Sequence, residues 1–334
     1  MLGLVGQLGF YISADAQRED AAAGFCVPAK HPLQSTWYVR RHQNDNEGFL
    51  DKEMARRVRV FCCVLTSDAQ GDQAAAALET WLPRCNGHAF VVRGPAPANI
   101  SVSESRDVLW AKTKLAFQHL YHTRLNNYDW FMKADDDTYV IVENLRFLLL
   151  SQSPEEAVYF GAKFKNIVKQ GYMSGGAGYV LSRAAVRALV ERNLGNAQGC
   201  RQDGGGAEDA ELGKCLEAAG VRAGDSRDAS GASRFHYLSM EDSLVLADGN
   251  DSGYWAVANS WYPILKGVSC CSDYAVSFHY VNASQMRMME YLVYRLRPFG
   301  SSSFHSLPKS NQATIQAALR LSQTVKGSDE MAQV

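Results

Sequence analysis

Several features that would assign the chain to a class at once are missing from its 334 residues. No apolar run reaches the roughly 20 residues of a membrane-spanning helix, and the apolar stretch at residues 1–12 lacks the basic lead-in of a signal peptide. Neither sign of charge dominates, since the formal net charge is −1. Nucleic acid and anionic membranes are therefore not expected as main partners. No segment repeats at a fixed period, which disfavours a repeat architecture.

The cysteines include no CxxC pair, so a structural zinc site is improbable. Their even number, eight, fits disulfides formed in an oxidising compartment, although buried free thiols are the alternative. Sequons at Asn99, Asn250 and Asn282 also favour the secretory pathway. The cysteines are Cys26, Cys62, Cys63, Cys85, Cys200, Cys215, Cys270 and Cys271.

Buried-strand and helix patterns alternate along the first half of the chain. The predicted order is strand, helix, strand, helix, strand over residues 57–66, 72–81, 89–92, 107–125 and 130–132. This order predicts an α/β fold with a Rossmann-like, mostly parallel sheet flanked by helices. Later helices are expected at 144–150, 183–192, 207–219 and 286–296, and later strands at 158–161 and within 271–281.

Three consecutive carboxylates, Asp135, Asp136 and Asp137, follow the third strand. Adjacent acids repel one another and cannot be buried without partners, and a divalent cation with oxygen ligands is the usual solution. Alternate residues of an extended chain point the same way, so Asp135 and Asp137 can share an ion while Asp136 faces elsewhere. A solvated acidic turn is the alternative. The end of a strand in an α/β sheet is where ligands bind, which favours the metal.

Residues 171–182 contain four glycines and then a strand-like run. Glycine lets backbone approach a ligand closely, so Gly175 and Gly176 are candidates for contact with a bound nucleotide. A phosphate loop of the GxxxxGK[ST] type is absent.

Long motifs resemble the inverting β1,3-glycosyltransferases of the GT-A fold, and most closely the core 1 β1,3-galactosyltransferases. They are Lys133-Ala-Asp-Asp-Asp-Thr-Tyr-Val140, the glycine-rich residues 169–182, Ala223-Gly-Asp-Ser-Arg-Asp228 and residues 270–281. The likeness covers roughly residues 56–300. We therefore expect a stem or linker over residues 1–55, a GT-A catalytic domain over 56–300 and a mobile tail over 301–334.

The resemblance implies transfer of galactose from UDP-galactose to the 3-hydroxyl of GalNAc on Ser or Thr of mucin-type glycoproteins. The implied cofactor is Mn²⁺, held by Asp135, Asp137 and His279, where it would neutralise the leaving diphosphate. Without the resemblance, His279 would be interpreted as a strand histidine with its hydrogen bonds satisfied. Asp136 would contact the ribose or a neighbouring cation.

The family's general base matches the acid pair at the start of the predicted helix 207–219. The resemblance implies Asp209 as the base, with Glu208 as the alternative, although first-turn acids are commonly helix-dipole partners or caps. The preceding loop, residues 202–206, departs from the family pattern and looks loose.

Substrate contacts are also implied by the resemblance. Thr66, Trp110 and Lys112 would lie at the donor, with core packing as the alternative for Trp110. On the acceptor side the implied residues are an aromatic cluster, suited to stacking on a sugar, and an acid for sugar hydroxyls: Tyr254, Trp255, Trp261, Tyr262 and Glu241.

Further expectations come from the same resemblance. Disulfides are implied for Cys62–Cys85 and Cys200–Cys215, with a bond between the adjacent Cys270 and Cys271 as a further option. Cys26 and Cys63 are then left over. The family also implies the Golgi lumen, a homodimer and a dedicated chaperone, although its N-terminal membrane helix is not recognisable here. Alternative functions are another β1,3-glycosyltransferase, fringe-like or GlcNAc-transferring, and a non-catalytic folding partner.

Overall fold

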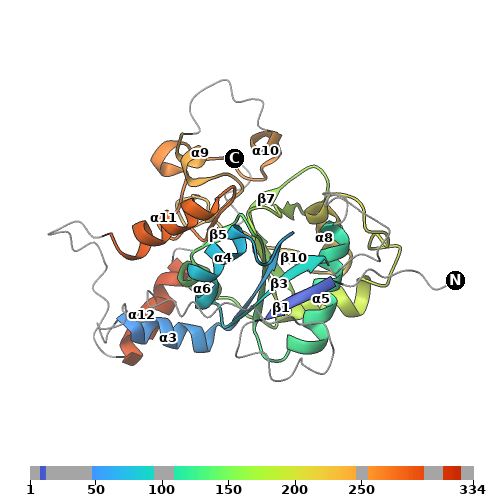
Figure 1. Cartoon of the computed structure of the whole chain (residues 1–334), viewed down its shortest axis with the longest axis horizontal. Coiled ribbons are helices and arrows are strands. Elements are labelled where there is room, and N and C mark those ends of the chain that lie inside the picture. Colours follow the sequence, from blue (N-terminus) through green and yellow to red (C-terminus); the bar gives the residue numbers. More distant parts are fainter. Residues whose placement is uncertain (1–7, 13–46, 94–108, 246–254, 297–310, 325–334) are drawn as a thin grey trace.

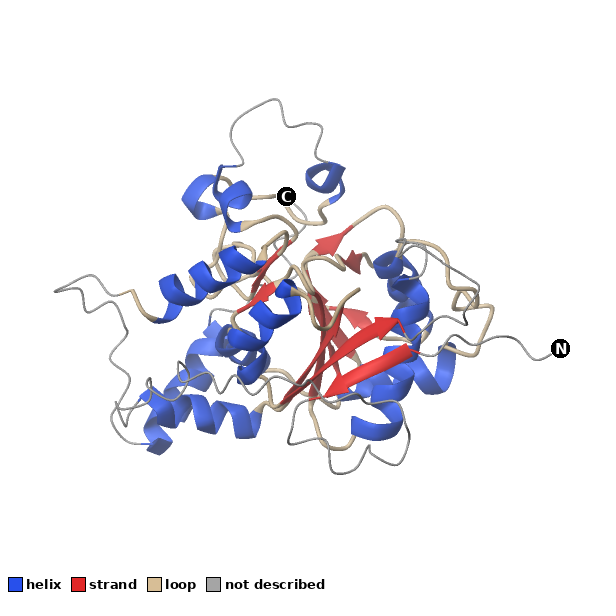
Figure 2. Cartoon of the chain, viewed as in Figure 1, coloured by secondary structure: helices blue, strands red, loops and turns tan. Residues whose placement is uncertain are grey.

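The computed structural model describes residues 8–12, 47–93, 109–245, 255–296 and 311–324. A seven-stranded sheet lies at the centre of this part of the chain, in the order β1-β3-β2-β4-β9-β6-β10 (Figure 1, Figure 2). β2 is parallel to β3 and β4, and β10 is parallel to β6, whereas β1 and β9 are antiparallel to their neighbours. The strands are β1 (Leu8–Ile12), β2 (Val60–Leu65), β3 (Gly87–Arg93), β4 (Trp130–Asp135), β6 (Val158–Gly161), β9 (Tyr179–Ser182) and β10 (Arg222–Ala223).

Helices cover both faces of this sheet, which explains the continuous hydrophobic runs of its strands. Cys62 and Val64 of β2 belong to one core, whereas Cys63 and Leu65 belong to the other. The first core includes residues of α4 (Asp72–Glu79), α6 (Val142–Leu149) and α11 (Ala283–Tyr294). The second includes residues of α5 (Leu109–Arg124), α7 (Arg183–Ala188) and α8 (Glu208–Ala218). The α/β fold expected from the sequence is therefore confirmed.

A small second sheet brings two distant parts of the chain together. It has the order β11-β12-β5, made of β11 (Phe235–His236), β12 (Ser277–Phe278) and β5 (Tyr139–Val140). Phe278 of β12 lies opposite Tyr139 of β5 in an antiparallel ladder, and the Val281 amide donates to the Asp137 carbonyl over 2.9 Å. The strand expected within residues 271–281 is thus only two residues long, but its register places His279 beside the acidic turn.

Short elements complete the described chain. A two-stranded sheet of β7 (Lys163–Phe164) and β8 (Tyr172–Met173) lies near α10 (Trp255–Asn259), and α9 (Met240–Val245) precedes α10. The helix expected over 183–192 is α7 followed by a π-helical turn, Leu189–Asn193. 3-10 turns occupy Leu82–Arg84 and Gly267–Ser269.

The ends of the domain differ from the expected boundaries. Within the predicted stem, β1 extends the sheet beside β3, and α3 (Glu47–Arg57) packs on α6. Within the predicted mobile tail, α12 (Asn311–Thr324) packs on α3 and α6. Its buried residues Ile315, Ala318 and Ser322 are spaced for one helical face, a stripe too sparse to stand out in a polar sequence.

Three disulfides join the expected pairs, Cys62–Cys85, Cys200–Cys215 and Cys270–Cys271. Cys63 is buried and free, while Cys26 lies outside the described residues, as do the sequons at Asn99 and Asn250. Asn282 is exposed and caps α11. Among the helices that the structure describes, none has the length and apolar character to cross a membrane.

Candidate active site

The acidic turn and His279 form one cluster of ligand atoms. Asp135 ends β4, Asp137 lies in the turn before β5, and His279 follows β12. Each side chain offers an atom within 4.8 Å of the other two, and His279 Nε2 lies 3.3 Å from Asp137 Oδ1. The Thr138 hydroxyl accepts from the Asp135 amide over 3.2 Å and donates to the Gly176 carbonyl over 2.9 Å, which fixes the turn. We call Asp135, Asp137 and His279 the metal cluster.

The surroundings of His279 orient its ring toward the carboxylates. His279 Nδ1 lies 3.4 Å from the Tyr237 carbonyl, a contact in which Nδ1 carries the proton and donates. Nε2 then keeps its lone pair on the side of the carboxylates, as in metal-binding histidines whose other nitrogen donates to a carbonyl. One imidazole and two carboxylates suit a divalent cation, so these residues fit the metal that the sequence implies.

Gly176 is required by this histidine. A Cβ atom at Gly176 would lie 2.2 to 2.6 Å from three atoms of the His279 ring. A Cβ atom at Gly175 would lie 2.8 Å from Glu208 Oε2. The two glycines expected at the nucleotide thus lie against side chains of the site itself. The close approach read from the glycine-rich sequence exists, and here its partners are His279 and Glu208.

Asp136 faces away from the metal cluster, toward the end of β2. Its Oδ2 accepts a 2.6 Å hydrogen bond from the Thr66 hydroxyl, and burial raises the pKa of the Asp136 carboxyl. Lys112 is buried, and its Nζ donates to the Thr66 carbonyl over 3.3 Å. Thr66, Asp136 and Lys112, expected at the donor, are therefore neighbours at one edge of the sheet.

Glu208, the first residue of α8, is buried and surrounded by donors. Its Oε1 accepts from the Thr113 hydroxyl over 2.8 Å and from the Tyr179 hydroxyl over 2.6 Å. Its Oε2 lies 3.7 Å from the Lys133 ammonium. Burial raises the pKa of Glu208 despite the nearby lysine charge. A carboxylate held this way is fixed in place.

Asp209 is only partly buried, and its hydrogen bonds come from the backbone. Oδ2 accepts from the Gly175 amide over 3.0 Å and Oδ1 from the Ala210 amide over 2.8 Å. Burial raises the pKa of this carboxyl also. Asp209 therefore combines access to solvent with a pKa moved toward neutrality, which suits a general base.

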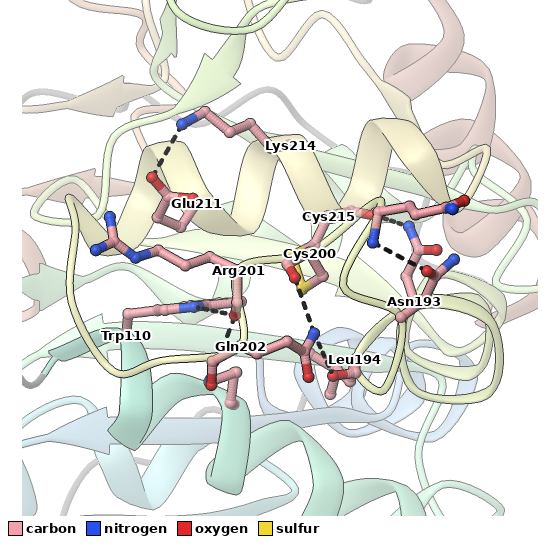
Figure 3. Close-up of a disulfide and its surroundings, with 12 residues drawn as sticks. Trp110, Asn193, Leu194, Cys200, Arg201, Gln202, Glu211, Lys214 and Cys215 are labelled. Carbon is pink, nitrogen blue, oxygen red and sulfur yellow. Dashed lines mark hydrogen bonds and ion pairs between the residues drawn. A yellow bond between two sulfur atoms is a disulfide. The ribbon is translucent and has the colours of Figure 1, made fainter.

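The loop before the acid pair, expected to be loose, is tied down (Figure 3). The Cys200–Cys215 disulfide joins its start to α8. Trp110 Nε1 donates to the Arg201 carbonyl over 3.0 Å, and Lys114 Nζ donates to the carbonyls of Gln202 and Asp203 over 2.6 and 2.9 Å. Trp110 is fully buried, which fits the core-packing alternative considered for it.

Lys133 is a residue of this site to which the sequence pattern assigned no role. It lies on β4 two residues before Asp135, so both side chains point to the same face. Its Nζ lies 2.8 Å from Asp135 Oδ1 and donates to the Gly175 carbonyl over 3.1 Å. The spacing of two residues between Lys133 and Asp135 on a predicted strand could have indicated that their side chains lie together. Thr113 and Tyr179, which bind Glu208, carried no comparable signal.

The residues expected at the acceptor are less closely arranged. Glu241 is exposed on α9, Trp255 is 61% exposed on α10, and Tyr254 lies outside the described residues. Tyr262 is buried, with the Arg227 guanidinium 3.6 Å from its ring centroid, so that ring face is covered.

A cavity lies beside Tyr262, and some of the residues that line it also contact the metal cluster. Lys163, Arg227 and Tyr262 line this cavity, as do residues 236–238. The carbonyls of residues 236–238 accept from the amide or ring of His279. One segment therefore forms the wall of the cavity and holds the histidine of the metal cluster.

Comparisons with known proteins agree with this geometry. A family model described as Fringe-like matches residues 95–228. The chain is 38% identical over 282 residues to glycoprotein-N-acetylgalactosamine 3-beta-galactosyltransferase 1 of Xenopus laevis, covering 83% of this chain and 78% of that protein. Human chondroitin sulfate glucuronyltransferase is 32% identical over 179 residues, 50% of this chain but 22% of that protein. Human chondroitin sulfate synthase 3 is 25% identical over 199 residues, 52% of this chain and 22% of that protein.

The Fringe-like match and the mostly parallel sheet flanked by helices together confirm the GT-A fold expected from the sequence. The identity to the Xenopus protein extends over most of both chains. The chain therefore belongs to the glycoprotein-N-acetylgalactosamine 3-beta-galactosyltransferase family, within the Fringe-like glycosyltransferases.

Proposed function

We propose that this protein transfers galactose from UDP-galactose, with inversion, to the 3-hydroxyl of GalNAc linked to Ser or Thr, which makes the core 1 O-glycan. The observation that carries the proposal is the junction at Gly175 and Gly176. The Gly175 amide binds Asp209, and the next residue packs against His279 of the metal cluster. The residue proposed as the base and the cluster proposed to hold the metal therefore contact neighbouring glycines of one short segment, which supports the proposal.

Mn²⁺ is the proposed cofactor, and Asp135, Asp137 and His279 would hold it. When bound, the cation supplies Lewis-acid neutralisation of the diphosphate that departs. We assign Thr66 and Asp136 to the nucleoside end of the donor, with Lys112 behind them. Gly175 and Gly176 are also assigned to the donor region, because they lie against Glu208 and His279.

Asp209 is the proposed general base. It would accept the proton of the acceptor hydroxyl as that oxygen bonds to the anomeric carbon, while the bond from that carbon to the diphosphate breaks and UDP leaves with the electron pair. One displacement at the anomeric carbon inverts it and needs no covalent intermediate. Glu208 suits this role less, because its two oxygens already face Thr113, Tyr179 and Lys133. We assign Glu208 a positioning role.

The acceptor is proposed to bind beside α9 and α10. Trp255 is available for stacking on a sugar and Glu241 for hydrogen bonds to sugar hydroxyls, because both side chains are exposed. Tyr262 is proposed to shape the cavity wall, since Arg227 covers one face of its ring.

A UDP-release assay tests the function directly. With UDP-galactose, Mn²⁺ and a GalNAc-α-threonine peptide, we expect release of UDP and a galactosylated product cleaved by a β1,3-specific galactosidase. UDP-GlcNAc in place of UDP-galactose serves as the control donor. Turnover only with UDP-GlcNAc would indicate another β1,3-glycosyltransferase. Absence of turnover with either donor would favour a non-catalytic folding partner, although Asp135, Asp136 and Asp137 are all present.

The Golgi lumen is the proposed location, and the three disulfides, which need an oxidising compartment, support it. The homodimer and the dedicated chaperone implied by the family belong to the same proposal. Light scattering of the purified protein and co-expression with candidate chaperones would test them.

A further inference from the structure

The described residues contain a buried cation in the middle of the candidate active site. Lys133 is 3% exposed and lies on the central strand β4. Its ammonium lies 2.8 Å from Asp135 Oδ1, 3.1 Å from the Gly175 carbonyl and 3.7 Å from Glu208 Oε2. One charged group therefore contacts a residue of the metal cluster, the glycine segment and the acid pair.

Gly175 transmits this arrangement to Asp209. Its carbonyl accepts from Lys133, and its amide donates to Asp209 Oδ2 over 3.0 Å. A Cβ atom at this position would lie 2.8 Å from Glu208 Oε2 and 3.4 Å from Lys133 Nζ. Only glycine lets these side chains close around it without displacement.

Stability alone gives a poor reason for this lysine. Removing an ammonium and its carboxylate partners from water is costly, and well-packed apolar side chains of similar size often serve as well or better. The contacts are instead specific, since each acceptor belongs to a different functional part of the site.

We propose that Lys133 is a positioning residue that sets the distance between the metal cluster and the acid pair. It fixes one oxygen of Asp135, a residue of the metal cluster, and it holds Glu208 and Gly175, the neighbours of Asp209. This inference rests on the proposed function, because it assigns the lysine to the geometry of that reaction.

Lys133→Met tests the proposal, since methionine keeps most of the side-chain length and removes the charge. We expect kcat to fall roughly a hundredfold, the size of loss that a misplacement of about 1 Å produces. The affinity for UDP with Mn²⁺, measured by calorimetry, should fall by less than kcat, because the lysine contacts only one of the three residues of the metal cluster. Lys214→Met is the matched control, because this lysine of α8 is 45% exposed and pairs with Glu211 at 2.9 Å, outside the candidate site. It should keep the wild-type kcat.

A double-mutant cycle makes the test specific. If Lys133 acts through Glu208, then Lys133→Met combined with Glu208→Gln should lower kcat little more than the stronger single variant. Fully additive losses would overturn the proposal. So would a Lys133→Met variant that loses UDP–Mn²⁺ affinity and kcat in the same proportion, because that result indicates a collapsed site.

Gly175→Ala covers the case in which Lys133→Met does not fold. It keeps the lysine charge and presses on Glu208 and Lys133, so kcat should fall while UDP–Mn²⁺ binding persists; an unchanged kcat would overturn the proposal. The two hypotheses fail separately. A wild-type protein without turnover on UDP-galactose and the GalNAc peptide refutes the function, whereas an active wild type with unaffected variants refutes only the role of Lys133.

Discussion

The metal cluster and acid pair differ from the proposed acceptor region in how they are built. Lys133 and Glu208 are buried, and each contacts two or more residues of the site. Glu241 and Trp255 are exposed and lie on short helices beside the cavity. Charge chemistry depends on fixed positions, whereas sugar recognition tolerates adjustable surfaces. Substitutions in the metal cluster or the acid pair should therefore change kcat, whereas substitutions in the proposed acceptor region should change the acceptor KM.

The largest effect is expected from Asp209→Asn. Loss of a general base lowers kcat by about 10²–10⁴-fold, while UDP–Mn²⁺ binding should remain because the metal cluster is intact. Steady-state assays and calorimetry would measure the two quantities. Glu208→Gln is the comparison, and a larger kcat loss there than in Asp209→Asn would reverse the assignment of the base.

The same residue predicts a pH dependence. Burial raises the pKa of Asp209, so the base becomes protonated, and inactive, at a higher pH than an exposed aspartate of pKa about 3.9 would. The rate should therefore fall on the acid side of the profile, and the residual turnover of Asp209→Asn should lack this dependence. An unchanged acid limb in that variant would assign the titration to another group.

The Cys200–Cys215 disulfide is expected to give the next largest effect, on stability. It closes a loop of 15 residues, and in the chain-entropy model its loss costs about 3 kcal/mol. Cys200→Ser/Cys215→Ser should lower the free energy of unfolding, measured with urea, by that amount. The control is Cys270→Ser/Cys271→Ser, because adjacent cysteines close almost no loop. Equal losses in both variants would contradict the loop explanation.

A smaller effect is expected from Gly176→Ala. The added methyl group would press on the His279 ring and turn it from Asp137. Displacing a metal ligand or its support lowers metal affinity by about 10–100-fold. Titration of Mn²⁺ followed by electron paramagnetic resonance would measure it. Gly195→Ala is the matched control, since nothing lies within 4 Å of a Cβ atom there.

The smallest effect is expected at the exposed aromatic. Trp255→Ala should raise the acceptor KM by about tenfold or less, the size of one aromatic stacking contact, and leave kcat unchanged. Met288→Ala on α11, where the side chain is similarly exposed at 54%, is the control. A large kcat loss in Trp255→Ala would instead group this residue with the metal cluster and the acid pair.

The sequence by itself determined the alternation of strands and helices, the acidic turn and the glycine segment. These are local properties: periodicity defines β4, charge repulsion marks Asp135 and Asp137, and glycine marks a close approach. The resemblance of long motifs supplied the rest of what was expected, including His279 and the disulfide pairs.

Only the tertiary structure decided what each of these residues contacts. The pairing of β12 with β5 carries His279 to Asp137 across more than a hundred residues, and Gly176 proves to accommodate that ring. The docking of α12 and the links from Lys133 to Gly175 and Glu208 depend in the same way on packing between distant segments. Local pattern cannot encode such contacts, because they arise only when separate elements share one core.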